Sequence, residues 1–269
     1  MKTRPAPICA PICRPIALAA CLAMTALSAQ ATPVVDQHYG AMPGWTYEGQ
    51  TGPAFWGGLS PAYWACGNGI RQSPIDVTAV TLADLPTLAL KYPGGALSVM
   101  NTGRELKLRG GPRDVLDSGW AAYNLRHIDI RVPAEHRLDG REFAAELQLV
   151  HQSADGHVAI LSVLLEEGRP NRAIDRVLAA LPSDKGLERT LPDQSFSAHE
   201  LLPANLSYAR YTGSLTTPPC TERVDWFVLR SPLTLSAEQA KLLRQAVGGR
   251  ANARPLQPRN GREIPATRD

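Results

Sequence analysis

The sequence predicts a single, mainly β domain built on one twisted, mostly antiparallel sheet with a few peripheral helices. Short runs of alternating apolar and polar residues dominate the chain, as expected for strands that are buried on one face. Turn-forming residues are frequent, with 22 Gly and 23 Pro in 269 residues. Helical periodicity is confined to a few short segments, and no internal repeat or low-complexity break indicates a second domain.

Seven strands and two helices can be placed by pattern. The short strands are bounded by Gly, Pro or Asn, and one helix opens with a capping box at Ser236. A further helical turn is expected within residues 196–202. The predicted strands cover 88–92, 97–100, 105–108, 123–132, 144–151, 158–165 and 223–230, and the helices 172–181 and 236–248.

The N-terminal segment has the features of an export signal. Positive charge precedes a short apolar run, and the tripeptide Ala29-Gln30-Ala31 resembles a cleavage site. The run is shorter than the roughly 20 residues that span a bilayer, so no transmembrane segment is expected. Leu18–Cys21 also has the form of a lipoprotein processing site, so attachment through Cys21 is the alternative to cleavage near Ala31.

These features predict four regions and an exported protein. We expect a signal peptide over residues 1–31, a linker over 32–44, a folded domain over 45–262 and a C-terminal tail over 263–269. The expected location is the periplasm or the external medium. Net charge is +3 without a run of Lys or Arg, which argues against a nucleic-acid partner and against a polybasic membrane patch.

Export changes how the cysteines are interpreted. Cleavage would leave only Cys66 and Cys220 in the mature chain. In an oxidising compartment, two cysteines most simply form one disulfide, and two buried free thiols are the alternative.

Two of the predicted strands carry polar residues on one face. In residues 123–132, His127, Asp129 and Arg131 alternate with apolar Ile128 and Ile130. In residues 144–151, Glu146 and Gln148 share the face opposite Leu147 and Leu149.

Several ordered motifs carry a resemblance to a known family. They are Trp45-Thr46-Tyr47-Glu48, Gln72-Ser73-Pro74-Ile75, Pro133-Ala134-Glu135-His136, the run 211–222 followed by Val224 and Trp226, and Arg254-Pro255 with Gln257-Pro258 and Asn260-Gly261. With these motifs, the chain from Trp45 to about Gly261 resembles the α-class carbonic anhydrases. The resemblance implies a central ten-stranded sheet, a cone-shaped pocket holding a catalytic zinc, and the Cys66–Cys220 bridge of bacterial members.

The resemblance also places this chain's residues at family site positions. Asp129, Arg131 and Gln148 fall where the family has its three zinc-binding histidines. Glu146 falls on the carboxylate that supports the third ligand, and His127 replaces a glutamine that belongs to the first ligand strand.

Other family positions are kept in part. The gatekeeper pair corresponds to Thr216 and Glu135, and Arg104 follows the turn after which the proton-shuttle histidine is usual. Further pocket positions implied by the resemblance are Val150, Ile160, Leu215, Thr217 and Trp226.

The residues at the ligand positions are unsuited to zinc. A catalytic zinc takes about three nitrogen, sulfur or carboxylate donors, whereas a guanidinium has no lone pair to offer. We therefore expect no cofactor and no CO2 hydration, and an exported, carbonic-anhydrase-related binding or interaction module. The alternative is an active carbonic anhydrase with an atypical metal site, for example one made of His127, Asp129 and Glu146. Esterase-like chemistry is disfavoured because no Ser-His-Asp arrangement is visible.

The substitutions also predict a local structure. Asp129 and Arg131 lie two apart on one strand face, so they can form an internal ion pair with Gln148 and His127 as hydrogen-bond partners. This arrangement can be purely structural. In the functional version, Arg131 presents its forked donors to a small anion or carboxylate at the pocket floor.

Overall fold

A computed structural model describes residue 1 and residues 44–268. Apart from residue 1 and residue 44, the predicted signal peptide and linker lie outside the described residues. Within the described part of the chain, no helix is both long enough and apolar enough to cross a membrane.

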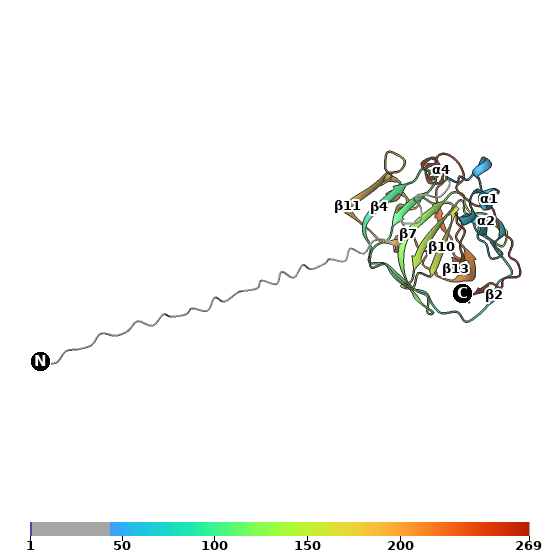
Figure 1. Ribbon diagram of the computed structural model, residues 1–269, viewed down its shortest axis with the longest axis horizontal. Helices are drawn as coiled ribbons and strands as arrows, with labels where there is room; N and C mark the ends of the chain where they lie inside the picture. Colours follow the sequence, from blue (N-terminus) through green and yellow to red (C-terminus); the bar gives the residue numbers. More distant parts are fainter. Residues whose placement is uncertain (2–43, 269) are drawn as a thin grey trace. The chain divides into compact units, whose positions relative to one another are not determined.

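A large mixed sheet dominates residues 44–268, as predicted. It contains 13 strands, and its continuous path runs β11-β4-β5-β7-β9-β10-β13-β12-β15-β2, which is ten strands. Most neighbours are antiparallel, and the parallel pairs are β10 with β13, β10 with β14, and β15 with β2. Figure 1 shows the long strands following one another from β11 to β13, with α1 and α2 to one side.

The seven predicted strands correspond to β3, β4, β5, β7, β9, β10 and β13 to within a few residues, because strand alternation is clearest where one face is buried. The other strands were not predicted, among them the long β11 and β12. In the large sheet the strands are β2 (Thr81–Leu82), β3 (Ala89–Lys91), β4 (Gly95–Asn101), β5 (Leu106–Arg109), β6 (Val115–Asp117), β7 (Ala122–Arg131), β9 (Ala145–Gln152), β10 (Val158–Glu167), β11 (Glu188–Phe196), β12 (Tyr208–Ser214), β13 (Glu222–Leu229), β14 (Leu233–Leu235) and β15 (Pro265–Ala266). A second, two-stranded parallel sheet pairs β1 (Asp76–Val77) with β8 (Arg137–Leu138).

The helices are short, and the two longest, α3 and α4, are capped by polar side chains. Asn171 accepts from the amides of Ala173 and Ile174 at the start of α3, and Ser236 with Gln239 forms the predicted capping box of α4. The helical elements are η1 (Gly49–Thr51), α1 (Trp56–Leu59), η2 (Pro61–Tyr63), α2 (Trp64–Asn68), α3 (Arg172–Ala179), η3 (Ala198–Leu201) and α4 (Ala237–Ala246).

The C-terminal residues take part in the sheet. Residues 263–269 are predicted as a tail after the domain, whereas Pro265–Ala266 forms β15 between β12 and β2. Ile264 and Ala266 are both fully buried. Their apolar side chains therefore add to the core formed by the sheet.

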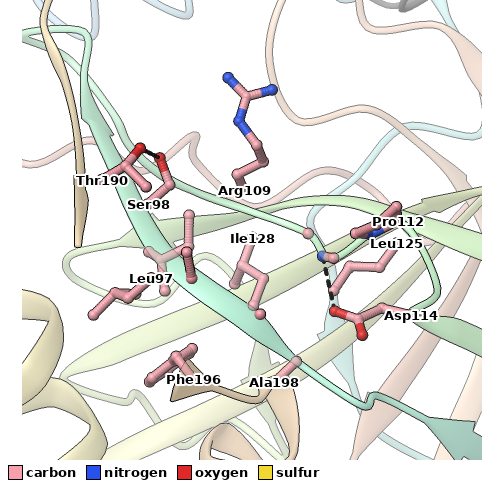
Figure 2. Close-up of a pocket in the computed structure, with 15 residues that line it drawn as sticks. Leu97, Ser98, Arg109, Pro112, Asp114, Leu125, Ile128, Thr190, Phe196 and Ala198 are labelled. Carbon is pink, nitrogen blue, oxygen red and sulfur yellow. Dashed lines mark hydrogen bonds between the residues drawn. The ribbon is translucent and has the colours of Figure 1, made fainter. Parts of the chain in front are cut away.

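The apolar face of the central strands forms the main core, and the opposite face carries the polar residues. Ile128 and Ile130 of β7 pack with Leu147 and Leu149 of β9 in this main hydrophobic core. Strands β4 and β5 are paired only next to the turn that connects them, from Asn101 opposite Leu106 to Val99 opposite Leu108. Beyond that point a cavity lies where the two strands diverge (Figure 2).

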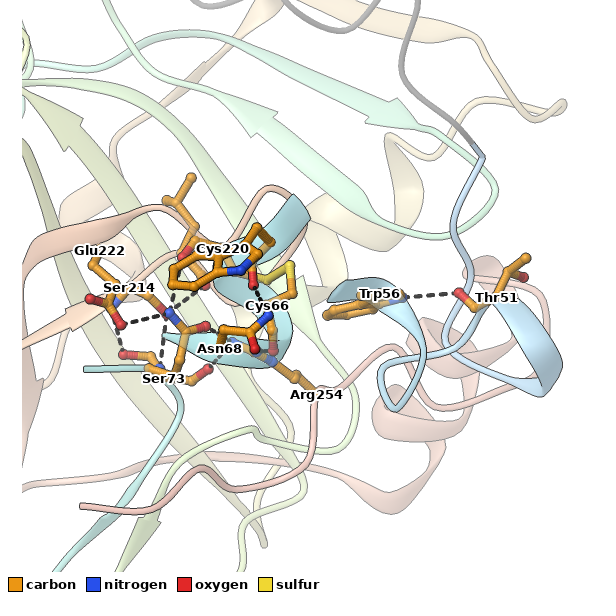
Figure 3. Close-up of a disulfide and its surroundings, with 12 residues drawn as sticks. Thr51, Trp56, Cys66, Asn68, Ser73, Ser214, Cys220, Glu222 and Arg254 are labelled. Carbon is orange, nitrogen blue, oxygen red and sulfur yellow. Dashed lines mark hydrogen bonds between the residues drawn. A yellow bond between two sulfur atoms is a disulfide. The ribbon is translucent and has the colours of Figure 1, made fainter. Parts of the chain in front are cut away.

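The predicted disulfide is confirmed. Cys66 in α2 and Cys220 are joined with their Cα atoms 5.0 Å apart (Figure 3). The buried guanidinium of Arg254 donates to the carbonyl oxygens of Cys66 (2.9 Å) and Ser73 (2.8 Å). Gln72 donates to the carbonyl of Cys220 at 3.1 Å, so hydrogen bonds secure both cysteines.

Candidate functional site

Three neighbouring strands bring the candidate residues together. In the sheet register, Asp129 of β7 lies opposite Gln148 of β9 and opposite Lys107 of β5. Arg131 lies opposite Glu146. Directly opposed residues on paired strands point to the same face, so these five polar side chains converge on one side of the sheet.

Arg131 is the centre of this group. Its side chain is fully buried, with 1% of the residue exposed. Nη1 donates to the hydroxyl of Tyr47 and to Glu105, both at 2.6 Å. Nη2 lies 3.4 Å from Asp129 Oδ2, and Nε donates to Gln148 Oε1 at 3.3 Å. The structure thus contains the ion pair between Asp129 and Arg131 that the strand pattern predicts, with Gln148 as its hydrogen-bond partner.

Glu105 and Lys107 also belong to the site, although neither is among the site residues predicted from the sequence. Lys107 Nζ lies 2.7 Å from Asp129 Oδ1 and 3.5 Å from Glu105 Oε2. Both residues come from the segment just after Arg104, where Glu105 and Lys107 are two apart. This two-residue spacing was the available sequence signal for the two residues. It indicates that they share a polar face of a strand, but not which strand lies beside it.

The charges of four side chains in this group balance, and a further carboxyl group, that of Glu135, lies 3.7 Å from Arg131 Nε. Two carboxylates, Asp129 and Glu105, face two cations, Arg131 and Lys107. Burial opposes ionisation of Asp129, but the positive charges of Lys107, His127 and Arg131 hold its pKa well below the usual value. Burial likewise opposes ionisation of Glu105, and Lys107 and Arg131 lower its pKa. Both carboxylates are therefore ionised at neutral pH.

Gln148 connects this group to Glu135. Its amide nitrogen donates to Glu135 Oε2 at 2.6 Å and to Glu146 Oε1 at 3.1 Å. Glu135 also accepts from the backbone amide of Arg254 at 2.8 Å and from the hydroxyl of Thr216. Burial raises the pKa of Glu135, and the charge of Glu146 adds to the effect. The gatekeeper positions Thr216 and Glu135 are thus in contact.

Glu146 is turned toward the protein interior. Its Oε1 lies 2.8 Å from His136 Nδ1 and accepts from Ser162 at 2.8 Å, while Oε2 accepts the amides of Glu135 and His136 at 2.9 Å. Burial opposes ionisation, but His136 and these donors lower the pKa of Glu146 to about 2. The other nitrogen of His136 contacts the Tyr211 hydroxyl at 2.6 Å. Glu146 therefore holds the β7–β9 connection in place.

The remaining predicted pocket residues are less closely associated. His127 is partly exposed, and its Nε2 lies 3.4 Å from Asp129 Oδ2. Arg104 contacts Trp45: its Nη1 donates to the Trp45 carbonyl oxygen, and its guanidinium carbon lies 4.5 Å from the centroid of the Trp45 ring. Ile160 and Trp226 are buried in an apolar cluster that also contacts the partly buried Val150 and Leu215, and Thr217 is partly buried in the turn before Cys220.

Comparison with known proteins identifies the class that this fold represents. Residues 51–268 match the family described as eukaryotic-type carbonic anhydrase. The chain therefore belongs to the carbonic anhydrase family, of the α class. It is similar to a carbonic anhydrase of Klebsiella pneumoniae, with 34% identity over 90% of this chain and 96% of that protein.

Solved structures agree with this assignment. The α-carbonic anhydrase of Thermovibrio ammonificans in complex with the inhibitor sulfanilamide superposes with a TM-score of 0.80 and 34% identity, over 84% of this chain and all of that chain. Dioscorin complexed with ascorbate superposes with a TM-score of 0.76 and 32% identity, over 83% of this chain and 98% of that chain.

Proposed function

We propose that this carbonic anhydrase family member carries an ion network in place of the catalytic zinc, and is an exported binding module that does not hydrate CO2. The supporting observation is the position of Arg131: a buried guanidinium that contacts Glu105, Asp129, Gln148 and Tyr47 at the centre of the site. By family resemblance, this is where imidazole nitrogens converge on zinc.

The donor set of the site does not fit zinc. Zinc needs lone pairs from neutral imidazoles, thiolates or carboxylates at about 2.0–2.3 Å. A guanidinium offers none and cannot be deprotonated in a protein. The Gln148 oxygen already accepts from Arg131 at 3.3 Å, and the Asp129 carboxylate contacts both Arg131 and Lys107. A divalent ion at this place would face two positive side chains within the same group.

Charge compensation explains how the fold tolerates these residues. Removing one partner of a buried ion pair typically costs about 3–5 kcal/mol, because a buried charge is left uncompensated. Here each carboxylate has two cationic neighbours, since Glu105 and Asp129 both contact Arg131 and Lys107. The four side chains therefore act as one unit that fills the centre without a metal.

A small anion at Arg131 is the less favoured form of the proposal. The guanidinium is only 1% exposed, and its hydrogen bonds go to protein groups. An incoming anion would have to displace Glu105 or Asp129 from Arg131, leaving that buried carboxylate with Lys107 as its only cationic neighbour in the network. A binding role for the scaffold as such is supported by the similarity to dioscorin, which was solved with ascorbate.

Metal content and activity, measured together, test the proposal. The mature chain is purified from zinc-supplemented medium, its metal is quantified by mass spectrometry, and CO2 hydration is followed by stopped flow. We expect less than about 0.1 equivalent of zinc and no rate above background. The Klebsiella relative, prepared in parallel, controls for metal loss during purification. One equivalent of metal with sulfonamide-sensitive hydration would establish the alternative, an active enzyme with an atypical metal site.

A further inference from the structure

A cavity at the diverging ends of β4 and β5 combines apolar walls with one buried carboxylate. Its volume is about 190 Å3, larger than the engineered cavity of about 150 Å3 that accommodates benzene. The apolar lining includes Leu97, Leu125, Ile128 and Phe196. No member of the ion network around Arg131 lines this cavity, so its properties do not depend on whether that site holds a metal.

The carboxylate is that of Asp114, which is 3% exposed. In the part of the chain that the structure describes, its hydrogen-bond partners are backbone amides: Gly111 donates to Oδ2 at 2.9 Å, and Gly94 to Oδ1 at 3.3 Å. Within the described residues, no Lys, Arg or His side chain forms an ion pair with it. Buried charges in proteins are normally paired, so Asp114 lacks the cationic partner that its burial calls for.

Glycines allow the loop to approach this closely. A Cβ at Gly111 would lie 2.9 Å from Asp114 Oδ2, and a Cβ at Gly110 would lie 2.7 Å from the carbonyl oxygen of Leu125. At Gly110 the near atom is backbone, so only glycine fits; at Gly111 a larger residue would have to push the Asp114 carboxylate aside. Figure 2 shows Asp114 beside the apolar residues, with Arg109, Ser98 and Thr190 on the far side of the same cavity.

We propose that this cavity binds a small organic cation, an amine with an apolar body, whose charged group pairs with Asp114. The apolar walls favour an organic body, and the buried carboxylate favours a positive head group over a neutral one. A bare metal ion is disfavoured, because Ca2+ takes 6–8 oxygen ligands and Asp114 is the only carboxylate among the lining residues. Arg109 is already engaged with Glu188 through two hydrogen bonds, at 2.8 and 2.6 Å, so it does not compete for Asp114.

Benzylamine and its neutral counterpart benzyl alcohol are suitable probes, because they differ mainly in the charged group. Each is titrated into the isotopically labelled mature protein, and amide shifts are followed by NMR. We expect benzylamine to bind at least about tenfold more tightly than benzyl alcohol, with the largest shifts at the amides of Gly94 and Gly111. Equal affinities, or shifts confined to other parts of the chain, would overturn the proposal.

Matched variants locate the interaction. Asp114→Asn should abolish the preference for the amine, whereas Asp117→Asn, which removes an exposed carboxylate from nearby β6, should leave it unchanged. Ala198→Met keeps Asp114 but fills part of the cavity, so it should weaken both probes by about tenfold or more. It also provides a test if Asp114→Asn does not fold. Wild-type affinity in Ala198→Met, or a retained amine preference in folded Asp114→Asn, would contradict the assignment.

Discussion

The guanidinium of Arg131 lies 2.6 Å from the carboxylate of Glu105, and 1% and 7% of these two residues are exposed. Arg131 is the last residue of β7 and Glu105 immediately precedes β5, the strand paired with β7, so their contact depends on the sheet register. Asp129 and Lys107, which face each other in that register, complete the network. The centre of the site is thus held by ion pairs between strands.

Removing the central cation should destabilise the protein strongly. Arg131→Met leaves Asp129 and Glu105 with Lys107 as their only cation in the network, so we expect a loss of about 3–5 kcal/mol in the free energy of unfolding. Urea unfolding at neutral pH measures it. Lys241→Met removes an exposed cation paired with Glu238 and should cost less than about 1 kcal/mol. Similar small losses in both variants would show that the buried pair is not important for folding.

Removing both partners should cost less than the two single changes together. Arg131→Met with Glu105→Gln leaves Lys107 and Asp129 as a balanced pair at 2.7 Å. A double-mutant cycle built from the same urea curves should give a coupling energy of at least about 1 kcal/mol. Additive losses would mean that Glu105 and Arg131 contribute independently.

Restoring histidines should create a zinc site. In the triple variant Asp129→His, Arg131→His and Gln148→His, one negative and one positive charge are removed, and Lys107 keeps Glu105 as a partner at 3.5 Å. We expect about one equivalent of zinc by mass spectrometry, and tighter binding when Lys107→Ala removes the neighbouring cation. A folded triple variant that binds no zinc would show that these positions are not equivalent to the family's ligands.

Acid should destabilise the protein through Glu146. The pKa of Glu146 is lowered from 4.5 to about 2 in the folded state, so its stabilisation is complete above the unfolded pKa and is lost as pH falls from about 4.5 toward 2. The loss should be of the order of 3 kcal/mol, and Glu146→Gln should flatten this part of the curve. Urea unfolding at several pH values measures the slope. The exposed control Glu142→Gln should keep it, and an unchanged slope in Glu146→Gln would contradict the assignment.

The disulfide should provide a large part of the stability. It joins residues 154 apart in sequence, and closing a loop of that length restricts the unfolded chain by about 5 kcal/mol in the entropy model. Cys66→Ala with Cys220→Ala should lower the free energy of unfolding by roughly that amount. Addition of dithiothreitol to the double variant should have no further effect. A loss below about 1 kcal/mol would mean that other contacts hold these segments equally well.

Export and processing can be checked by the intact mass of the mature protein. Cleavage near Ala31 predicts an N-terminus close to Thr32. Lipid attachment predicts an N-terminus at Cys21 with the added mass of acyl chains. A protein that keeps residues 1–31 would contradict both versions of export.

The sequence alone was sufficient for the class of fold and for part of the site. Apolar alternation in residues 123–132 and 144–151 predicts β7 and β9 and separates Ile128 from Asp129, because side chains on a strand alternate between its two faces. The same spacing predicts the pair of Asp129 with Arg131. The ordered motifs identify the family and imply the Cys66–Cys220 bond. All of these depend on local periodicity or on short runs of residues.

The other members of the site depended on the tertiary structure. Lys107 meets Asp129 only because β5 pairs with β7 in one particular register, and Tyr47 reaches Arg131 from 84 residues away. Asp114 lies in a cavity because β4 and β5 diverge after a short stretch of pairing. Strand patterns show which face a side chain takes but not which strand lies beside it. Register and strand order come from packing the whole chain, and they decide which charges are paired in the interior.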